Sequence, residues 1–148
     1  MPNILIASDH AGFELKGKLI VFLKSLGYEV KDFGANSFDP KDDYPDLIIP
    51  LAKEISKYPN LKGIILGGSG QGEAIVANRF KGVRAAVFYG GSEDVVRSSR
   101  EDNDSNVLSL GARYLDEEKA IEAVKIWLNT SFSGEERHVR RLKKIDEI

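Results

Sequence analysis

The sequence predicts an α/β protein, a three-layer αβα sandwich built on a sheet of five parallel strands. Short apolar runs alternate with segments of helical periodicity along all 148 residues, which is the pattern of repeated βα units. No repeat, linker or low-complexity stretch divides the chain, and its length is sufficient to bury a core without covalent cross-links. We therefore expect a single domain over residues 1–148.

Five apolar runs are expected to form the strands. They are Asn3–Ser8, Glu29–Phe33, Lys62–Leu66, Arg84–Phe88 and Asn106–Leu110. Between the runs, apolar residues recur at helical spacing. This spacing predicts helices near Phe13–Leu26, Leu47–Lys57, Glu73–Phe80, Ser92–Glu101 and Glu117–Asn129, with a last helix from Glu135 onward.

Composition excludes several classes of function. The chain has no cysteine, so disulfides, zinc-thiolate sites and a cysteine nucleophile are excluded. A formal charge of −2 gives no general attraction to nucleic acid or to an anionic membrane. The apolar run Ile4–Ala7 is too short for a signal peptide, and no stretch approaches the length of a membrane span. We expect a cytoplasmic protein with no nucleic-acid or membrane partner.

The most informative motif is the glycine-rich segment Gly67–Glu73, which directly follows an apolar strand. Glycines at 67, 68, 70 and 72 leave backbone N–H groups free to approach a ligand closely. A helix expected from Glu73 would aim its positive dipole end at the same place. The alternative to a ligand site is a turn with only a structural role, in which Glu73 stabilises the dipole of the following helix. No Gly-Lys-Ser/Thr follows, which excludes a P-loop, and the glycine spacing argues against a dinucleotide fingerprint.

Further polar residues lie at or near the ends of the expected strands. In open parallel sheets ligands bind outside the carboxyl ends of the strands. The first strand ends in Ser8-Asp9-His10, and the segment Asp102–Asn106 precedes the fifth strand. We expect these groups and the glycine segment to converge on one edge, covered by the loop from Asp39 to Pro45 that carries Tyr44. Asp9 could instead only cap the following helix, and His10 could be a solvated loop residue.

Three arginines suggest an anionic ligand. Arg137 and Arg141 are four residues apart, so they share one helix face and could bind a phosphate. Arg113, just past the fifth strand, is another cation at the expected ligand edge. A solvated charged face is the alternative for the C-terminal run, which lacks the aromatic partners of a nucleic-acid site.

In combination, motifs along essentially the whole chain resemble the ribose-5-phosphate isomerase B family, which has galactose-6-phosphate isomerase relatives. These motifs are Asp9–Lys16, Asp43–Pro45, Gly67–Glu73, Ala77–Arg79, Asn103–Leu108, Gly111–Arg113 and Arg137-His138. The resemblance implies a Rossmann-like aldose–ketose isomerase with no metal or organic cofactor. It also implies a homodimer or homotetramer whose sites draw on two subunits, with the C-terminal helix, about residues 135–148, packing on the partner.

The resemblance also implies a role for each site residue. Some members carry a cysteine base at the position of Gly67, whereas another branch has glycine there and a glutamate closing the loop, which makes Glu73 the implied base. The oxyanion donors implied are the Ser69 hydroxyl and the loop N–H groups at Gly70 and Gly72, and Gly68 is a further implied substrate contact. The remaining implied contacts are Asp9, His10, Tyr44 and Asn103 on the sugar, and His10, Arg113, Arg137 and Arg141 on the phosphate.

One residue departs from the family pattern. Members usually carry histidine where this chain has Asp102, and that histidine opens the furanose ring of the substrate. A free histidine titrates near pH 6.5 and can both take and give a proton, whereas a free aspartate, with a pKa near 3.9, rarely holds one. Asp102 could act as the base with water or another group as acid, ring opening could be spontaneous, or the substrate could be acyclic.

The sequence thus predicts an enzyme that interconverts ribose 5-phosphate and ribulose 5-phosphate through an enediolate. An isomerase of another sugar phosphate, either an acyclic tetrose phosphate or a hexose 6-phosphate, is one alternative. A non-catalytic sugar-phosphate-binding protein is another, but binding alone gives no reason for a base at Glu73. A phosphoreceiver module is disfavoured because Gly67 stands where its aspartate would be.

Overall fold

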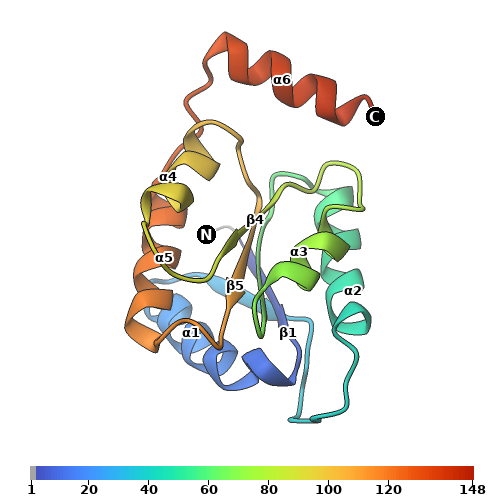
Figure 1. Ribbon diagram of the computed structural model, residues 1–148, viewed down its shortest axis with the longest axis vertical. Helices are drawn as coiled ribbons and strands as arrows, with labels where there is room; N and C mark the ends of the chain where they lie inside the picture. The colour runs from blue at the N-terminus through green and yellow to red at the C-terminus, as the bar shows by residue number, and fades with distance from the viewer. Residues whose placement is uncertain (1–2) are drawn as a thin grey trace.

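The computed structural model describes residues 3–148 and confirms the three-layer α/β architecture (Figure 1). Five parallel strands form one sheet in the order β2-β1-β3-β5-β4. The strands are β1 Asn3–Ser8, β2 Glu29–Asp32, β3 Lys62–Gly67, β4 Ala85–Phe88 and β5 Val107–Gly111. The helices are the 3₁₀ turn His10–Gly12, α1 Phe13–Ser25, α2 Tyr44–Lys57, α3 Gln71–Ala77, α4 Asp94–Glu101, α5 Glu117–Asn129 and α6 Glu136–Asp146.

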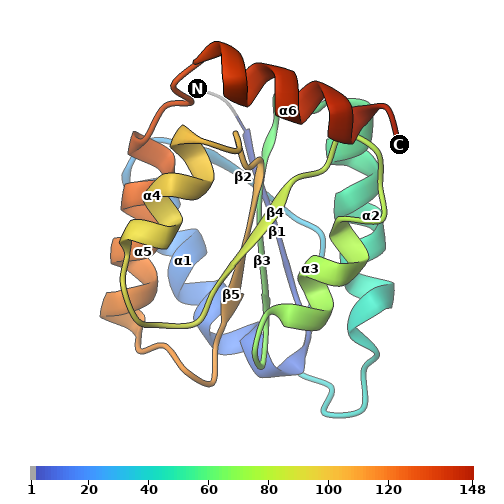
Figure 2. The same cartoon turned by 45° about the horizontal axis from the view of Figure 1, so that its top comes forward.

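The two faces of the sheet bury separate apolar clusters. Helices α1, α4 and α5 cover one face and α2 and α3 cover the other (Figure 2). Successive residues of β1 alternate between them, so that Ile4 and Ile6 pack on the first face and Leu5 and Ala7 on the second. The central strands are therefore apolar on both sides, as expected of a covered parallel sheet. In residues 3–148 no helix has both the length and the apolar character that crossing a membrane requires.

Two helices differ from the sequence-based expectation near the glycine loop. Helix α2 begins at Tyr44 because Pro45, in the first turn, needs no backbone hydrogen bond there. Helix α3 begins at Gln71 and ends at Ala77, earlier than expected at both ends. It stops there because the side-chain amide of Asn78 exchanges two hydrogen bonds, of 2.8 and 3.1 Å, with the backbone of Ala85. Glu73 consequently lies in the first turn of α3.

The C-terminal helix α6 lies across the amino-terminal ends of the strands (Figures 1 and 2). Its buried side chains are His138 and Leu142. Helix α4 runs back toward the same end and finishes just before Asp102, so the segment 102–106 enters β5 at its amino end. The expectation that all polar groups converge on one edge was therefore wrong for Asp102 and Asn103. Residues that precede a parallel strand lie at the opposite end of the sheet from residues that follow one.

Candidate functional site

The glycine loop turns sharply between β3 and α3 and places Glu73 over the end of the sheet. Gly70 caps α3 in the left-handed region at φ 78°, a conformation that side chains rarely adopt. Its carbonyl accepts a hydrogen bond of 2.6 Å from the Ser109 hydroxyl on β5. Glu73 is only 3% exposed although it is an acid in the first turn of a helix. The loop thus buries the carboxylate that the sequence singles out.

Each of three loop glycines is in close contact with one functional side chain. A Cβ added at Gly67 would lie 1.9 Å from Oε1 of Glu73, so the carboxylate fills the space where a side chain at position 67 would be. A Cβ at Gly68 would meet the Arg113 guanidinium at 2.9 Å, and one at Gly72 would meet the Tyr44 ring at 2.6 Å. The glycines therefore allow Glu73, Arg113 and Tyr44 to approach the same stretch of backbone.

The electrostatics of Glu73 favour its protonated form. Burial raises the pKa of the Glu73 carboxyl above its ordinary value, and the charge of Asp9 raises it further. Backbone N–H groups at Glu73 itself and at Gly70 lower the pKa, but they do not outweigh burial. A carboxyl whose pKa moves toward neutrality is better suited to both taking and returning a proton.

Asp9 has a structural contact in addition to its place at the site. It is buried, and its Oδ1 accepts hydrogen bonds from the N–H groups of Ala11 at 2.9 Å and Gly12 at 3.2 Å. Asp9 therefore caps the 3₁₀ turn His10–Gly12 and not α1 as expected, because the N-cap of α1 is Gly12. The same carboxylate acts on the pKa of Glu73, so it also belongs to the electrostatic environment of the site.

His10 is paired with an acid that sequence analysis missed. Its Nδ1 lies 2.7 Å from Oδ1 of Asp42, and its backbone N–H donates to the same oxygen at 3.3 Å. The hydrogen bond to Asp42 raises the pKa of His10, while burial and the nearby Arg113 charge lower it. Asp42 gave no signal beyond its position in the acidic loop that precedes Tyr44. The pairing favours a cationic His10 near Arg113, and two cations so placed can bind an anionic ligand.

The same neighbourhood holds a group of potential metal ligands. Among residues 3–148, Asp9, His10 and Asp42 form one cluster whose ligand atoms lie within 4.8 Å of one another. All three side chains already bond to protein groups. Asp9 accepts from backbone N–H groups, and Asp42 accepts from His10. The arrangement is therefore explained by the capping turn and the His10–Asp42 pair.

The remaining loop residue, Ser69, is half-buried between the two ends of the loop. Its hydroxyl accepts a hydrogen bond of 3.3 Å from the N–H of Gln71. The oxygen therefore lies near the N-terminus of α3, next to the loop N–H groups. Its expected role as an oxyanion donor remains a prediction.

The other predicted site residues form a second cluster at the opposite end of the sheet. Asp102 and Asn103 follow α4, and Arg137 and Arg141 lie exposed on α6. Nε2 of His138 lies 3.4 Å from Oδ1 of Asp102. A single chain thus brings Asp9, His10, Tyr44, Glu73 and Arg113 together, and it does not add the residues of this second cluster to them.

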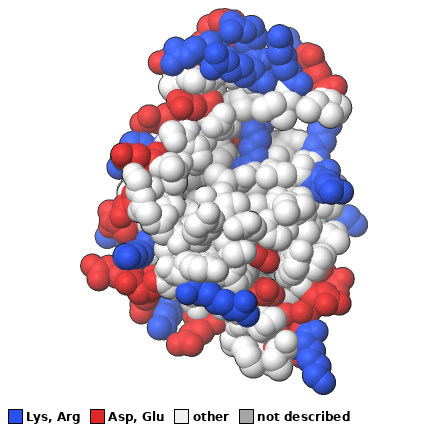
Figure 3. Space-filling view, in the orientation of Figure 1, with Lys and Arg blue, Asp and Glu red and all other residues white. Residues whose placement is uncertain are grey.

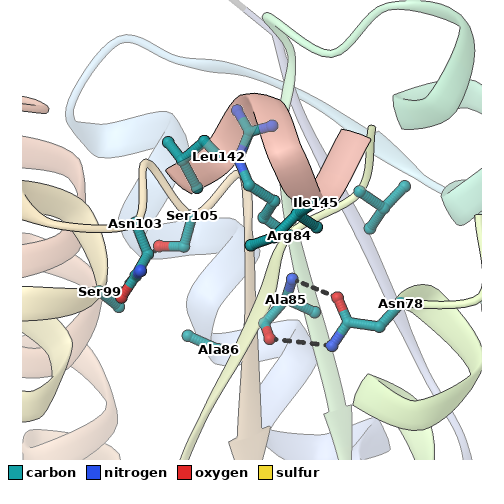
Figure 4. A pocket seen from close by; sticks show the side chains of 10 residues that line it. Asn78, Arg84, Ala85, Ala86, Ser99, Asn103, Ser105, Leu142 and Ile145 are labelled. Atoms are coloured by element: carbon teal, nitrogen blue, oxygen red, sulfur yellow. Dashed lines mark hydrogen bonds between the residues drawn. The ribbon is translucent and has the colours of Figure 1, made fainter. Parts of the chain in front are cut away.

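A cavity of about 350 Å³ lies below α6, next to the second cluster (Figure 4). Its walls carry apolar and amide side chains, including Asn78, Asn103, Leu142 and Ile145, together with Arg84. None of its lining side chains is a carboxylate or an imidazole that could move a proton. The chemistry of the candidate site is therefore at Glu73 and not in this cavity.

Comparison with known proteins shows the family to which the chain is similar. The Ribose/Galactose Isomerase family model matches residues 4–145. The chain is 38% identical over 145 residues to ribose-5-phosphate isomerase B of Mycolicibacterium paratuberculosis, covering 98% of this chain and 90% of that protein. Ribose-5-phosphate isomerase B from Mycoplasma genitalium, solved with bound ribulose-5-phosphate, aligns with a TM-score of 0.93 at 38% identity, covering 98% of this chain and 94% of the other. The ribose 5-phosphate isomerase from Thermotoga maritima aligns with a TM-score of 0.91 at 41% identity, covering 99% of both chains.

Proposed function

Because the chain belongs to the Ribose/Galactose Isomerase family, we propose that it interconverts ribose 5-phosphate and ribulose 5-phosphate, with Glu73 as the base. Glu73 takes the proton from C2 of the aldose, which gives an enediolate, and returns it to C1 of the ketose. A hydroxyl proton passes between the two oxygens in the same conversion. One carboxylate carries the carbon-bound proton in both directions, so this route needs no metal or organic cofactor.

The observation that carries the proposal is the burial of Glu73 in the space left by Gly67. Burial raises the pKa of the carboxyl, backbone N–H groups at Gly70 and Glu73 interact with it, and the Ser69 hydroxyl lies at the N-terminus of the same helix. Donors in that position can stabilise the negative oxygen of an enediolate, and the loss of one such donor typically slows a reaction about 10²–10³-fold. A protein that only binds sugar phosphates has no use for a buried carboxyl at that point.

The sugar contacts follow from the same geometry. His10 and Arg113 lie close enough for their charges to interact, Arg113 packs against Gly68 next to the Glu73 carboxylate, and the pairing with Asp42 favours the cationic form of His10. We assign both to the phosphate. Tyr44, packed against Gly72, and Asp9 remain for the sugar hydroxyls. The substrate would thus lie across the loop, with its C1–C2 end at Glu73.

We further propose that two copies of the chain complete each site. Asp102, Asn103, Arg137 and Arg141 lie at the far end of the sheet, so only a partner subunit can bring them to Glu73. A broad uncharged surface over β4, α3 and α4 supports this assembly, as does the concentration of Lys and Arg side chains on α6 (Figure 3). Exposed apolar side chains on this surface are Ile75, Tyr89 and Val95. A two-fold axis would use the surface on both copies at once.

The substrate panel tests the proposed reaction. Wild type, Glu73→Gln and the exposed control Glu122→Gln are assayed on ribose 5-phosphate, an acyclic tetrose phosphate and a hexose 6-phosphate. We expect turnover of ribose 5-phosphate by wild type and the control, and a loss of about 10²–10⁴-fold in Glu73→Gln. An unchanged rate in Glu73→Gln would refute the base assignment. Activity confined to the tetrose phosphate would favour the acyclic alternative raised by Asp102.

A further inference from the structure

The buried imidazole of His138 lies directly behind Asp102, the residue that departs from the family pattern. Nε2 of His138 is 3.4 Å from Oδ1 of Asp102, and the side chains are 9% and 48% exposed respectively. We propose that His138 is a positioning residue that acts through Asp102, and that the pair opens the ring of a cyclic sugar phosphate. This inference rests on the proposed isomerase function. It assigns to Asp102 and His138 together the task that one histidine performs elsewhere in the family.

The exposures decide which member of the pair reaches the sugar. Asp102 is half exposed and open to a ligand, whereas His138 is almost completely enclosed and can act only through its neighbour. An N–H at Nε2 would engage Oδ1 and leave Oδ2 of Asp102 free. Glu135 is also near the imidazole, with its Oε2 3.6 Å from Nε2, and the same oxygen is paired with the Arg137 guanidinium. Nε2 is therefore the ring nitrogen that faces the Asp102 carboxylate, and it is the atom through which His138 would act on Asp102.

The segment that carries Asp102 is held rigidly by residues on its carboxyl side. Asp104 adopts the left-handed region at φ 46°, which is uncommon for a residue with a side chain. Its carboxylate is held by Arg84 at 3.3 Å and by Arg100 at 2.9 Å. Arg100 also donates to the Ser105 carbonyl at 2.6 Å, and Trp127 donates to the Ser105 hydroxyl at 2.9 Å. Such a network fixes the backbone beside Asp102, as accurate positioning of a proton-transfer group requires.

The ring-opening step balances without any further reactant. The Asp102 carboxylate removes the proton from the C1 hydroxyl, and the C1–O4 bond breaks as the C1 carbonyl forms. The electron pair of that bond goes to O4, and the proton held on Asp102 then passes to O4. At the end of the step Asp102 is again a carboxylate. The open aldehyde is then available to Glu73, which lies on the other subunit of the proposed dimer.

Enzyme-concentration dependence separates ring opening from a purely structural ion pair. An enzyme that cannot open the ring must wait for spontaneous opening in solution, so its rate on ribose 5-phosphate stops rising as enzyme is added. An enzyme that is only destabilised loses the same fraction of its activity at every enzyme concentration and shows no such ceiling. Ribulose 5-phosphate cannot close a furanose ring because O5 carries the phosphate. Exchange of its C1 proton with deuterated water therefore reports the isomerisation chemistry alone.

The experiment compares wild type, His138→Ala, His138→Gln and the exposed α6 control Arg140→Ala in both assays. In His138→Ala we expect the rate on ribose 5-phosphate to stop rising as enzyme is added. At high enzyme concentration it should be about tenfold or more below the wild-type rate. The rate of deuterium exchange into ribulose 5-phosphate should stay within twofold of wild type. His138→Gln should recover part of the loss, since an amide N–H can still donate to Asp102. In an Asp102→His background, which places an imidazole at the sugar, His138→Ala should have little further effect.

The outcomes that overturn the inference are distinct from failure of the proposed function. Equal loss of turnover and of deuterium exchange in His138→Ala, without a ceiling, would make the contact purely structural. A ceiling already present in wild type would show that the pair does not open rings, while leaving the isomerase function intact. Absence of exchange in wild type would instead refute the proposed function and the inference with it.

Discussion

Glu73 and His10 are both shifted toward their protonated forms, for different physical reasons. Burial raises the pKa of Glu73 because the charged carboxylate loses solvation, whereas a hydrogen bond to Asp42 raises the pKa of His10 because it stabilises the cation. Near neutral pH the first effect aids a carboxyl that must take and return a proton. The second aids an imidazole that must face a phosphate. Two residues of the proposed site are thus tuned separately by their immediate neighbours.

The contact between His10 and Asp42 predicts a pH-dependent effect on substrate binding. Asp42→Asn removes the acid that raises the His10 pKa, so His10 loses its charge at a lower pH. Above the ordinary histidine pKa of about 6.5 we expect the KM for a sugar phosphate to rise severalfold relative to wild type. At pH 5.5, where His10 is protonated in both proteins, the difference should largely disappear. The measurement is KM against pH, with the exposed acid variant Asp46→Asn as control, and a difference that does not change with pH would contradict the assignment.

At the scale of elements, the turn from β3 into α3 decides the geometry of the site. Glycine at 67 leaves room for the Glu73 carboxylate, and the left-handed Gly70 directs α3 so that its first turn faces back over the strand. Helix α2, begun early at Tyr44, places that ring against Gly72. The loop is therefore a packed structural unit in which each glycine accommodates a functional side chain.

Gly67→Ala tests this packing directly. The new Cβ would overlap the Glu73 carboxylate, which must move, and a displacement of about 1 Å at a reacting group can cost about 10²-fold in rate. We expect at least that loss of kcat, and a fall in the free energy of unfolding of about 1–3 kcal/mol from overpacking. Gly17→Ala, in α1 with nothing within 4 Å of the added Cβ, is the matched control. It should retain activity and gain about 0.5–1 kcal/mol. Full activity in Gly67→Ala would show that the carboxylate need not occupy this position.

At the scale of the molecule, the proposed catalytic residues are divided between the two ends of the sheet. Glu73 and its neighbours follow β1, β3 and β5, whereas Asp102 precedes β5 and α6 crosses the amino ends (Figure 2). One chain therefore carries the two groups of proposed site residues at opposite ends of the sheet. In the proposed isologous dimer, the first group of each copy would meet the second group of the other.

Mixing of inactive variants tests this division. Glu73→Gln and Arg141→Ala are each expected to be nearly inactive alone, because each damages one half of every site. When the two proteins are co-refolded, about one quarter of wild-type activity should return, since half of the dimers are mixed and each mixed dimer holds one intact site. Co-refolding Glu73→Gln with His10→Ala is the control and should recover nothing, because both changes affect the same half. No recovery in the first mixture would refute the shared site.

Local patterns in the sequence were sufficient to predict the strands, the helices and the glycine loop with its acid. Apolar periodicity reports which residues must be buried, and the run Gly67–Glu73 is continuous in the chain, so its residues meet whatever the rest of the fold does. The sequence also contained the signal that Asp102 precedes a strand. That order already places it at the amino end of the sheet, although the initial expectation put it with Glu73.

Only the tertiary structure decided which distant side chains meet. His10 and Asp42 are 32 residues apart, and no local pattern pairs them. The contact between His138 and Asp102 depends on α6 crossing the end of the sheet. Burial raises the pKa of Glu73 and backbone N–H groups lower it, and the net direction likewise depends on how completely the neighbouring elements exclude water. The sequence by itself determined the fold class, the glycine loop and the position of its acid Glu73, because these depend on local order along the chain. The environment of each charge depends on packing between segments far apart in sequence, so only the folded molecule could decide it.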